Sequence, residues 1–414
     1  MILLKCLKEG RNMSLKIEKL DYEARGIAHQ DGKICFIKNA LPEEIVTMKI
    51  TADKKSFSEG KTTSIIKKSP LRKEAVCPYA NQCGGCVFSC VSYEDSLNLK
   101  KEILKDLLAY NKIQVAKVNL IPSSKSLEYR NKIALKIKDE QFGYYAEETH
   151  DFIPIKNCVI AARSIQNLLQ DFHLLHLKNG SLTIRSNYND ELLLIIDSDE
   201  KPKIDRLLVE KHKIAGTIWN QKCVYNSPFF IEKMEQNLYK VHADSFFQIN
   251  REIASKIASD ITKYFNEEDI VYDLYCGVGY FSVKLASKVK QVIGIESNTK
   301  AILDATYNAS LNGVSNCSFH AGKVEEIIAK IPFHGNKAII DPPRSGLKKN
   351  VVKYLQEHPL QQIIYISCNP QTLVRDILKL QKIYTISSLD IYDMFPFTKH
   401  MECVCVLNSK KGEI

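Results

Sequence analysis

A cysteine stands where a buried-strand pattern gives way to a helix pattern. Cys368 follows the run IIYIS, whose β-branched and aromatic residues are typical of a buried strand. Asn369 is a suitable helix N-cap, and Pro370 suits the first helical position because its missing N–H is not needed there. Cys368 is therefore expected at the positive end of a helix, where the pKa of a thiol falls and the thiolate becomes a nucleophile. The alternative is a small buried hydrophobic residue, the commonest role of a cysteine outside a disulfide.

Three more cysteines lie close together in the segment CPYANQCGGC. Cys77, Cys83 and Cys86 follow the spacing C-x5-C-x2-C. With one more thiolate, such a group could hold either zinc or an iron–sulfur cluster, and the spacing alone does not choose between them. The chain has 13 cysteines, an odd number, and no export signal is evident. Reduced thiols are therefore expected rather than a disulfide framework.

A glycine loop later in the chain predicts a nucleoside site. The segment DLYCGVG follows an apolar strand pattern, and its Gly277 and Gly279 allow the backbone to approach a ligand closely. Glu296 ends the next strand, and an acidic side chain about 20 residues after such a loop can bind both hydroxyls of a ribose. No phosphate-binding lysine follows, which favours S-adenosylmethionine, a nucleoside without pyrophosphate, over NAD. In the alternative interpretation, Glu296 ends a strand in solvent.

Two further acidic residues lie at strand ends in the same region. Asp341 ends the strand pattern of IIDPPRSG, and the two prolines after it restrict the backbone around the aspartate. Arg344 follows and suits an RNA phosphate or a carboxylate. In HMECVCVL, His400 and Glu402 would share one face of an apolar strand. The pKa of such a glutamate should be raised, which suits a proton acceptor, unless the residue faces solvent on an edge strand.

The elements that must position these residues form three regions. Residues 14–69 contain short strands with a hairpin signal at Asp31-Gly32, and they predict a small closed barrel. Residues 92–111 have helical periodicity, and residues 129–240 are strand-rich and irregular. From about Val241 the chain alternates strand and helix patterns. Such alternation predicts a parallel, doubly wound α/β sheet with its ligands at the carboxyl ends of the strands.

Composition is typical of a globular protein, and its positive charge indicates either a polyanionic partner or a solvated basic surface. It is 45% hydrophobic and 26% charged, which permits a sizeable core. The net charge of +10 and the pI of about 8.8 point to a partner such as nucleic acid. No apolar run reaches the length of a membrane span and no signal peptide is evident, so no membrane partner and a cytoplasmic location are expected. Met13 offers a second possible start, which would make residues 1–12 a tail.

Four motifs carry a resemblance to a known family. DLYCGVG, IIDPPRSGL, YISCNPQTLVRD and TKHMECV occur in the order found in the RNA uracil-C5 methyltransferases, which use S-adenosylmethionine. The N-terminal pattern LD-x-EARGIAH-x-DGK-x-CF, followed by ALPEE, resembles the TRAM domain, an OB-like RNA-binding barrel. The whole sequence is similar to the branch that carries a TRAM domain and a 4Fe–4S cluster and that modifies 23S ribosomal RNA. The resemblance covers residues 14–407.

The resemblance implies a role for individual residues. The implied catalytic residues are the nucleophile Cys368 and the base Glu402. The implied cofactor contacts are Gln248 of SFFQIN, Tyr275, Glu296 and Asp341. The implied cluster ligands are Cys77, Cys83, Cys86 and, as the fourth, Cys158 of IKNCVI. The family branch often has Asn where this chain has Tyr280, which argues against a cofactor contact at that position.

The chemistry explains why uracil methylation needs these residue types. Uracil C5 is a weak nucleophile, and a thiolate that adds to C6 converts the ring to an enolate whose carbon nucleophile is C5. After methyl transfer, a base must remove the C5 proton so that the cysteine can leave. The target base must leave its stack to reach the site. Phe246 or Phe247 could stack on it, although either could equally be a core residue.

The sequence thus predicts a monomeric RNA methyltransferase of three domains. These are a TRAM domain at 1–69, a central domain at 70–240 with the cluster, and a Rossmann-like methyltransferase domain at 241–414. Residues near 90–120 are expected to pack with the methyltransferase domain. Alternatives are a tRNA uridine-C5 methyltransferase, an amino-group nucleic-acid methyltransferase that would need no cysteine, and a non-catalytic RNA-binding assembly factor.

Overall fold

The computed structural model describes residues 14–146, 151–331 and 334–410. The second possible start at Met13 and the tail of residues 1–12 lie outside these ranges. Within the described ranges, none of the helices has the length and apolar character needed to cross a bilayer.

The chain forms two compact units. Unit 1 contains the described residues up to Tyr110 together with Phe397–Lys399. Unit 2 contains Asn111–Pro396 and the described residues from His400 onward.

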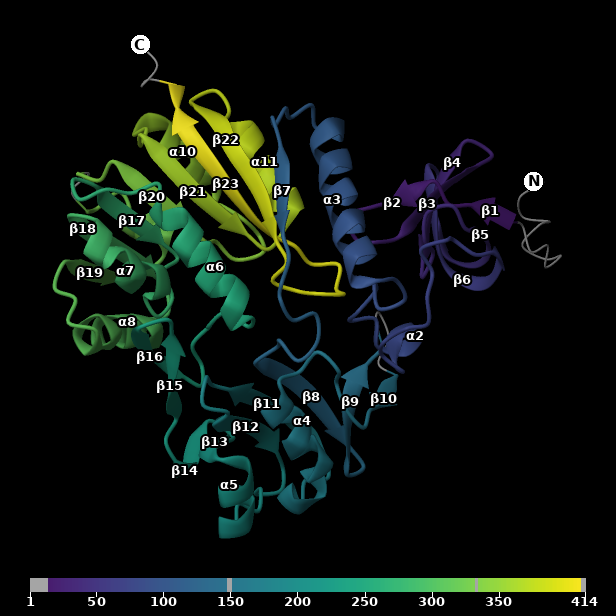
Figure 1. Cartoon of the computed structure of the whole chain (residues 1–414), viewed down its shortest axis with the longest axis horizontal. Helices are drawn as coiled ribbons and strands as arrows, with labels where there is room; N and C mark the ends of the chain where they lie inside the picture. The colour runs from purple at the N-terminus through teal and green to yellow at the C-terminus, as the bar shows by residue number, and fades with distance from the viewer. Residues whose placement is uncertain (1–13, 147–150, 332–333, 411–414) are drawn as a thin grey trace. The chain divides into compact units, whose positions relative to one another are not determined.

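Unit 1 is built on a six-stranded sheet with the order β1-β5-β6-β4-β3-β2 (Figure 1). Its strands are β1 (Ser14–Lys16), β2 (Lys19–Leu20), β3 (Gly26–Gln30), β4 (Lys33–Lys38), β5 (Ile45–Asp53) and β6 (Phe57–Lys67). The predicted hairpin is confirmed, since β3 pairs with β4 across Asp31 and Gly32, which both have positive φ. Among the described strand pairs β1 does not pair with β2, so closure into the predicted OB-like barrel is not confirmed.

The rest of unit 1 is helical. A short helix, α2 (Ala80–Cys83), lies within the cysteine-rich segment, and the predicted helix near 92–111 is α3 (Tyr93–Tyr110). The apolar residues Leu97, Ile103 and Leu104 of α3 are buried, in agreement with its helical periodicity.

Unit 2 contains a seven-stranded sheet with the order β10-β9-β8-β11-β12-β13-β14. Its strands are β8 (Lys132–Lys138), β9 (Gln141–Tyr145), β10 (Phe152–Pro154), β11 (Gly180–Ser186), β12 (Leu192–Ser198), β13 (Ile214–Trp219) and β14 (Lys222–Asn226). The helices α4 (Arg163–Gln170) and α5 (Arg206–His212) pack on β11 and β13. A two-stranded ribbon, β15 (Phe229–Met234) and β16 (Asn237–His242), follows in the sequence.

The second large sheet of unit 2 has eight strands with the order β19-β18-β17-β20-β21-β23-β22-β7. Its strands are β7 (Val118–Ile121), β17 (Ile270–Leu274), β18 (Gln291–Glu296), β19 (Cys317–Ala321), β20 (Lys337–Ile340), β21 (Gln362–Ser367), β22 (Tyr384–Tyr392) and β23 (Glu402–Ser409). The five strands from β19 to β21 are parallel, as predicted, whereas β23 runs antiparallel to both of its neighbours. Figure 1 shows β23 between β21 and β22.

Helices precede the first of the five parallel strands, β17, and connect the strands that follow it as far as β22. They are α6 (Arg251–Thr262), α7 (Tyr280–Leu285), α8 (Thr299–Leu311), α9 (Val324–Ile327), α10 (Lys349–Glu357) and α11 (Pro370–Leu380). In the sheet, β18 and then β19 lie on one side of β17, whereas β20 and then β21 lie on its other side. Since parallel crossovers are right-handed, this change of side places the connecting helices on both faces of the sheet. The neighbours β17 and β20 mark the switch point where such sheets bind ligands.

The core of unit 2 lies along this eight-stranded sheet. Val271, Val292, Ile339 and Ile364, from four parallel strands, are all fully buried in one cluster. Helix α6 adds Ile253, Ile257 and Ile261 to the same cluster. The four parallel strands are nearly continuous apolar runs in the sequence, the expected pattern for strands that are covered on both faces.

Candidate active site

Cys368 lies in the short turn between β21 and α11, as the sequence predicts. The strand ends at Ser367, Pro370 is the first residue of α11, and Asn369 caps this helix by accepting a hydrogen bond from the backbone N–H of Gln371 (3.1 Å). The predicted strand, cap and first helical residue are therefore confirmed. The Cys368 side chain is half-buried.

Glu402 is brought next to Cys368 by the pairing of their strands. The antiparallel register joins Gln362 to Asn408 and continues to Ser367 opposite Cys403. One step further along this register, Cys368 is opposite Glu402. Residues opposite each other in antiparallel strands point to the same face, with Cα atoms about 4.5–5.5 Å apart. The pairing therefore brings together two predicted site residues that are 34 positions apart in the sequence.

Burial decides between the two interpretations of Glu402. It is 5% exposed, and its strand lies between β21 and β22, so the alternative of a solvent-facing edge-strand glutamate is wrong. Burial raises the pKa of the Glu402 carboxyl well above its usual value, and nearby Asp341 raises it further, as predicted. His400 was expected to share the strand face of Glu402. The strand begins at Glu402, so His400 lies outside it.

The pKa of Cys368 differs from the prediction. Burial raises the pKa of this thiol to about 12, and the carboxyls of Glu402 and Asp341 raise it too, against the opposing effect of Arg344. The prediction that the end of a helix would lower this pKa is therefore wrong, because burial and two acidic neighbours outweigh the helix. At neutral pH the thiol holds its proton.

Asp341 lies at the end of β20, next to Gln248. The backbone N–H of Asp341 donates to the carbonyl of Leu274 (3.3 Å), and the Gln248 side-chain amide donates to the Asp341 carboxylate (3.5 Å). Burial, followed by the charge of Asp273, raises the pKa of Asp341 to about 7. Two of the predicted cofactor contacts, Gln248 and Asp341, therefore lie within hydrogen-bonding distance of each other.

These acidic groups line one edge of the sheet. Asp273 lies near the end of β17, Asp341 follows β20, Cys368 follows β21, and Glu402 begins β23. These four strands are consecutive neighbours in the sheet, and the antiparallel β23 starts where the parallel strands end. Four proton-binding groups are therefore placed side by side at the carboxyl edge, where doubly wound sheets bind their ligands.

The loop that begins at Asp341 is attached to the helix that follows Cys368. The Asn369 side-chain amide and the Thr372 hydroxyl both donate to the backbone carbonyl of Arg344 (3.1 and 3.3 Å). The Arg344 guanidinium also contacts Nδ1 of His400 (2.9 Å). These contacts hold the exposed guanidinium of Arg344 near Cys368.

The glycine loop has the shape expected of a nucleoside site. Gly277 has φ of 53°, and no heavy atom lies within 4 Å of the position that a Cβ would take, so the space above its backbone is open. Its N–H donates to Glu296 (3.3 Å), whose other carboxylate oxygen accepts from the N–H of Asn298 (2.7 Å). Glu296 is therefore oriented by the loop, as a residue that binds a ribose would need to be.

Two buried polar atoms around this loop have no hydrogen-bond partner among the described residues. They are the hydroxyl of Tyr275 and the Oδ1 atom of Asp273. Such atoms are costly in a folded protein unless a ligand or water satisfies them. Asp273 is fully buried, and burial raises its pKa to about 6. Asp273 was not among the predicted site residues, although its charge inside the apolar strand IVYDL is a signal in the sequence.

Aromatic residues near the site divide into core and surface. Tyr280 is 6% exposed and packs its ring against those of Tyr239 and Phe247 (centroids 5.4 and 5.7 Å away). Tyr280 is thus a core residue, in agreement with the argument against a cofactor contact there. Phe247 is buried in the same group, whereas Phe246 is 64% exposed. Of the two phenylalanines, only Phe246 is free to stack on a base.

The predicted cluster cysteines belong to two different units. Cys77, Cys83 and Cys86 lie in one segment of unit 1 around α2, and Cys158 lies in unit 2. Three thiols within ten residues are a suitable donor set for a cluster or for zinc. Across the ranges that the structure describes, no three His, Cys, Asp or Glu side chains are arranged to hold a metal ion.

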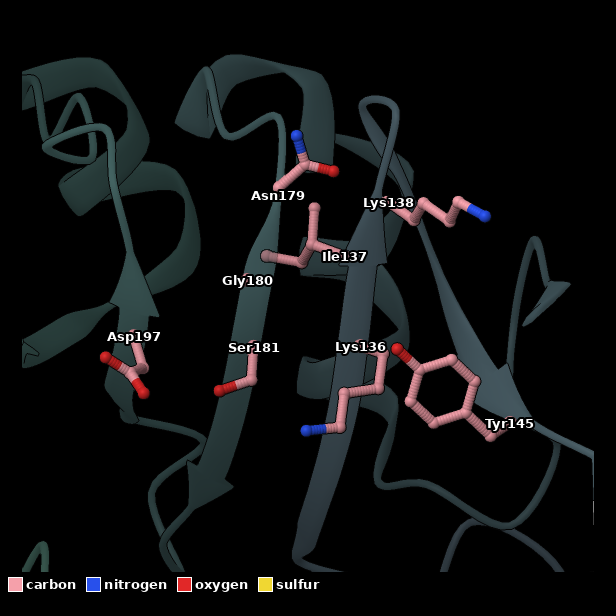
Figure 2. Close-up of a pocket in the computed structure, with 8 residues that line it drawn as sticks. All are labelled: Lys136, Ile137, Lys138, Tyr145, Asn179, Gly180, Ser181 and Asp197. Carbon is pink, nitrogen blue, oxygen red and sulfur yellow. The ribbon is translucent and has the colours of Figure 1, made fainter. Parts of the chain in front are cut away.

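A separate depression lies on the seven-stranded sheet. Its volume is about 490 Å³, and Figure 2 shows the residues that line it: Lys136, Ile137, Lys138, Tyr145, Asn179, Gly180, Ser181 and Asp197. None of these is a predicted site residue, and the depression was not predicted from the sequence.

The raised pKa of Asp341 predicts how stability depends on pH. An acid whose pKa rises from 3.8 to about 7 on folding makes the folded state less stable as pH increases between these values. Asp341→Asn should therefore match wild type near pH 4 and be more stable at pH 8. After allowance for partial exposure we expect about 1 kcal/mol, or roughly 2–4 °C in melting temperature. Melting temperatures that differ by the same amount at both pH values would contradict this.

Comparison with known proteins places these features in a family. Residues 203–410 match the family model described as tRNA (Uracil-5-)-methyltransferase, and residues 7–63 match the TRAM domain. An uncharacterized RNA methyltransferase of Aquifex aeolicus is 31% identical, with 97% of this chain and 100% of the relative covered. One from Bacillus cereus is 30% identical, with 97% of each covered.

A solved structure shares the fold. The Pyrococcus abyssi tRNA (uracil-54, C5)-methyltransferase, in complex with S-adenosyl-L-homocysteine, superposes with a TM-score of 0.77 at 24% identity. The superposition covers 95% of this chain and all of that one.

Proposed function

The chain belongs to the tRNA (uracil-5-)-methyltransferase family, and on this premise we propose that it methylates C5 of a uridine through a covalent bond to Cys368. The observation that carries the proposal is the strand register that places Glu402 opposite Cys368 at the carboxyl edge of the sheet. A nucleophile and a base on one face of two paired strands can act on neighbouring atoms of one ring.

In this mechanism Cys368 adds to C6 of uracil, and C5 becomes nucleophilic. Bound S-adenosylmethionine would supply the electrophilic methyl group. Glu402 then takes the proton from C5, and the Cys368 sulfur leaves C6. Burial raises the pKa of the Cys368 thiol to about 12, so the thiol must release a proton before its sulfur adds to C6. Asp341, whose pKa is about 7, is the neighbouring group that can accept this proton.

We assign cofactor binding to Gln248, Tyr275, Glu296 and Asp341. Two observations support a polar ligand here: the unsatisfied hydroxyl of Tyr275 and the unsatisfied Oδ1 of Asp273. The open space above Gly277 and the orientation of Glu296 fit a nucleoside. The Pyrococcus abyssi protein, which shares this fold, was solved with S-adenosyl-L-homocysteine.

We propose 23S ribosomal RNA as the substrate, with tRNA as the alternative. The resemblance of the TRAM and cysteine motifs supports the former. The name of the Pyrococcus abyssi protein, a tRNA methyltransferase, favours the latter. We propose three domains, each of which would serve RNA binding or catalysis: a TRAM domain (1–69), a central domain (70–240) and a methyltransferase domain (241–414). The position of β7 in the eight-stranded sheet supports a contribution of residues near 120 to the methyltransferase domain.

The experiment that tests the function is a map of 5-methyluridine in cellular RNA. Total RNA from cells with and without the gene is compared, and the purified protein is then given the unmodified RNA. We expect one or more 5-methyluridines in 23S ribosomal RNA to be lost with the gene and restored by the protein. Loss in tRNA instead would establish the alternative substrate. No change in 5-methyluridine anywhere would contradict the proposal.

We further propose that Cys77, Cys83, Cys86 and Cys158 bind a 4Fe–4S cluster. Protein purified without oxygen should be brown and contain about four iron and four sulfide per chain. Cys77→Ser should lose both, whereas Cys223→Ser, at an exposed position in β14, should retain them. Stoichiometric zinc without iron in anaerobically purified protein would overturn the assignment.

A further inference from the structure

The motif around Cys368 ends in an arginine–aspartate pair that the proposed mechanism does not use. Asp376 lies in the middle of α11 and is 0% exposed. We infer that Asp376 is a positioning residue, whose carboxylate fixes the loop that carries Asp341 and Arg344 against the helix that follows Cys368. The inference rests on the proposed roles of Cys368 and Asp341.

One oxygen of this carboxylate joins three elements. Oδ2 of Asp376 accepts a hydrogen bond from the backbone N–H of Leu347 (2.8 Å) and another from the hydroxyl of Tyr365 (3.0 Å). Leu347 belongs to the loop after β20, Tyr365 to β21, and Asp376 to α11. All three residues are buried, so water does not compete for these bonds. The carboxylate therefore ties the Asp341 loop to both elements that flank Cys368.

The other oxygen orients a second set of contacts to the same loop. Oδ1 of Asp376 accepts from Nε of Arg375 (2.9 Å). Nη2 of Arg375 in turn donates to the backbone carbonyl of Ser345 (2.9 Å). Because a guanidinium is planar, fixing Nε also fixes the direction of Nη2. Nη2 also donates to the backbone carbonyl of Leu347 (3.4 Å), so the Arg375–Asp376 pair holds the loop by one backbone N–H and two backbone carbonyls.

The loop packs directly on this pair at Gly346. Its φ is 71°, and a Cβ at this position would lie 2.5 Å from Oδ2 of Asp376 and 2.6 Å from Nη2 of Arg375. A side chain would therefore force the loop and the helix apart. The contacts of Asn369 and Thr372 to the Arg344 carbonyl fix the same loop nearer to Cys368. Together these contacts set how far Asp341 lies from the thiol.

The competing explanation is that the network only stabilises the fold. A matched control variant at Tyr384 distinguishes this explanation from a positioning role. Tyr384, at the start of β22, is buried like Tyr365, and its hydroxyl also bonds to backbone groups, accepting from Leu360 (2.9 Å) and donating to Leu355 (3.4 Å). No hydrogen bond of Tyr384 reaches the Asp341 loop. Both Tyr→Phe changes remove one buried hydroxyl, so their effects on melting temperature should be similar.

The experiment measures how fast Cys368 adds to RNA that carries 5-fluorouridine at the target position. Fluorine at C5 cannot be removed as a proton, so the reaction stops at the covalent adduct. Tyr365→Phe should slow adduct formation about tenfold and Asp376→Asn about 100-fold, since a displacement of 1 Å can cost that much. Tyr384→Phe should stay within about twofold of wild type. The rates are compared at saturating S-adenosylmethionine and RNA, so that a weaker cofactor contact of Asp341 does not enter them.

Equal adduct rates in Tyr365→Phe and Tyr384→Phe would overturn the inference. So would a folded Asp376→Asn protein that reacts at the wild-type rate. Should Asp376→Asn fail to fold, the comparison of the two tyrosine variants decides the question. Absence of an adduct with the wild-type protein would overturn the covalent mechanism itself, which is a distinguishable outcome.

Discussion

Cys368→Ala is expected to abolish methyl transfer to RNA while S-adenosylmethionine binds as in wild type. Without the sulfur nothing adds to C6 and C5 stays a poor nucleophile. Cys403, the neighbouring thiol in β23, is fully buried, and burial raises its pKa well above the usual value, so it should not replace Cys368. Three of the proposed cofactor contacts lie at the ends of β17, β18 and β20, and the fourth, Gln248, precedes α6, so their geometry does not depend on the sulfur. We expect turnover below a few per cent of wild type with an unchanged dissociation constant for the cofactor.

The measurement is transfer of labelled methyl groups to RNA, together with calorimetric titration of S-adenosylmethionine. Cys317→Ala is a matched control, because Cys317 is also half-buried in the same sheet and burial raises its pKa to about 12 as well. This control should retain at least half of the wild-type activity. Substantial methylation by Cys368→Ala would exclude covalent catalysis and favour the amino-group methyltransferase alternative, in which Asp341 acts without a cysteine.

Local signals allowed much of the site to be predicted. The β-branched run before Cys368 specifies β21, and Asn369 and Pro370 specify the start of α11, because each acts through its own backbone neighbours. The Asp31-Gly32 turn could likewise be predicted from its own residues. Such predictions need no knowledge of the rest of the chain.

Other features depend on which strands become neighbours. Only the register of β21 with β23 shows that Glu402 is opposite Cys368 and buried between strands. The error about the Cys368 pKa has the same origin, since the helix is local whereas the burial and the carboxyls come from distant segments. Asp376 lies within the cysteine motif, but its hydrogen bond to Leu347 joins residues 29 positions apart and is visible only in the fold.

The Glu402→Gln variant is expected to trap the enzyme on its RNA after methyl transfer. Addition of Cys368 to C6 and methylation of C5 both precede removal of the C5 proton, so only elimination requires the base. Glutamine has nearly the same shape as glutamic acid, and burial together with Asp341 raises the pKa of the Glu402 carboxyl, which favours its neutral form. The substitution therefore preserves the packing at the start of β23 and removes the ability to accept a proton.

A protein–RNA adduct that survives denaturation and carries the labelled methyl group should then accumulate to about one per chain. Gel electrophoresis after reaction with labelled S-adenosylmethionine detects it. The adduct should be absent from the Cys368→Ala, Glu402→Gln double variant, because no thioether can form, and it should persist in Glu402→Gln, Cys317→Ala. Normal turnover by Glu402→Gln, or an adduct that lacks the methyl group, would show that another residue removes the C5 proton. Asp341, the other carboxyl whose charge raises the pKa of Cys368, would then be the residue to test.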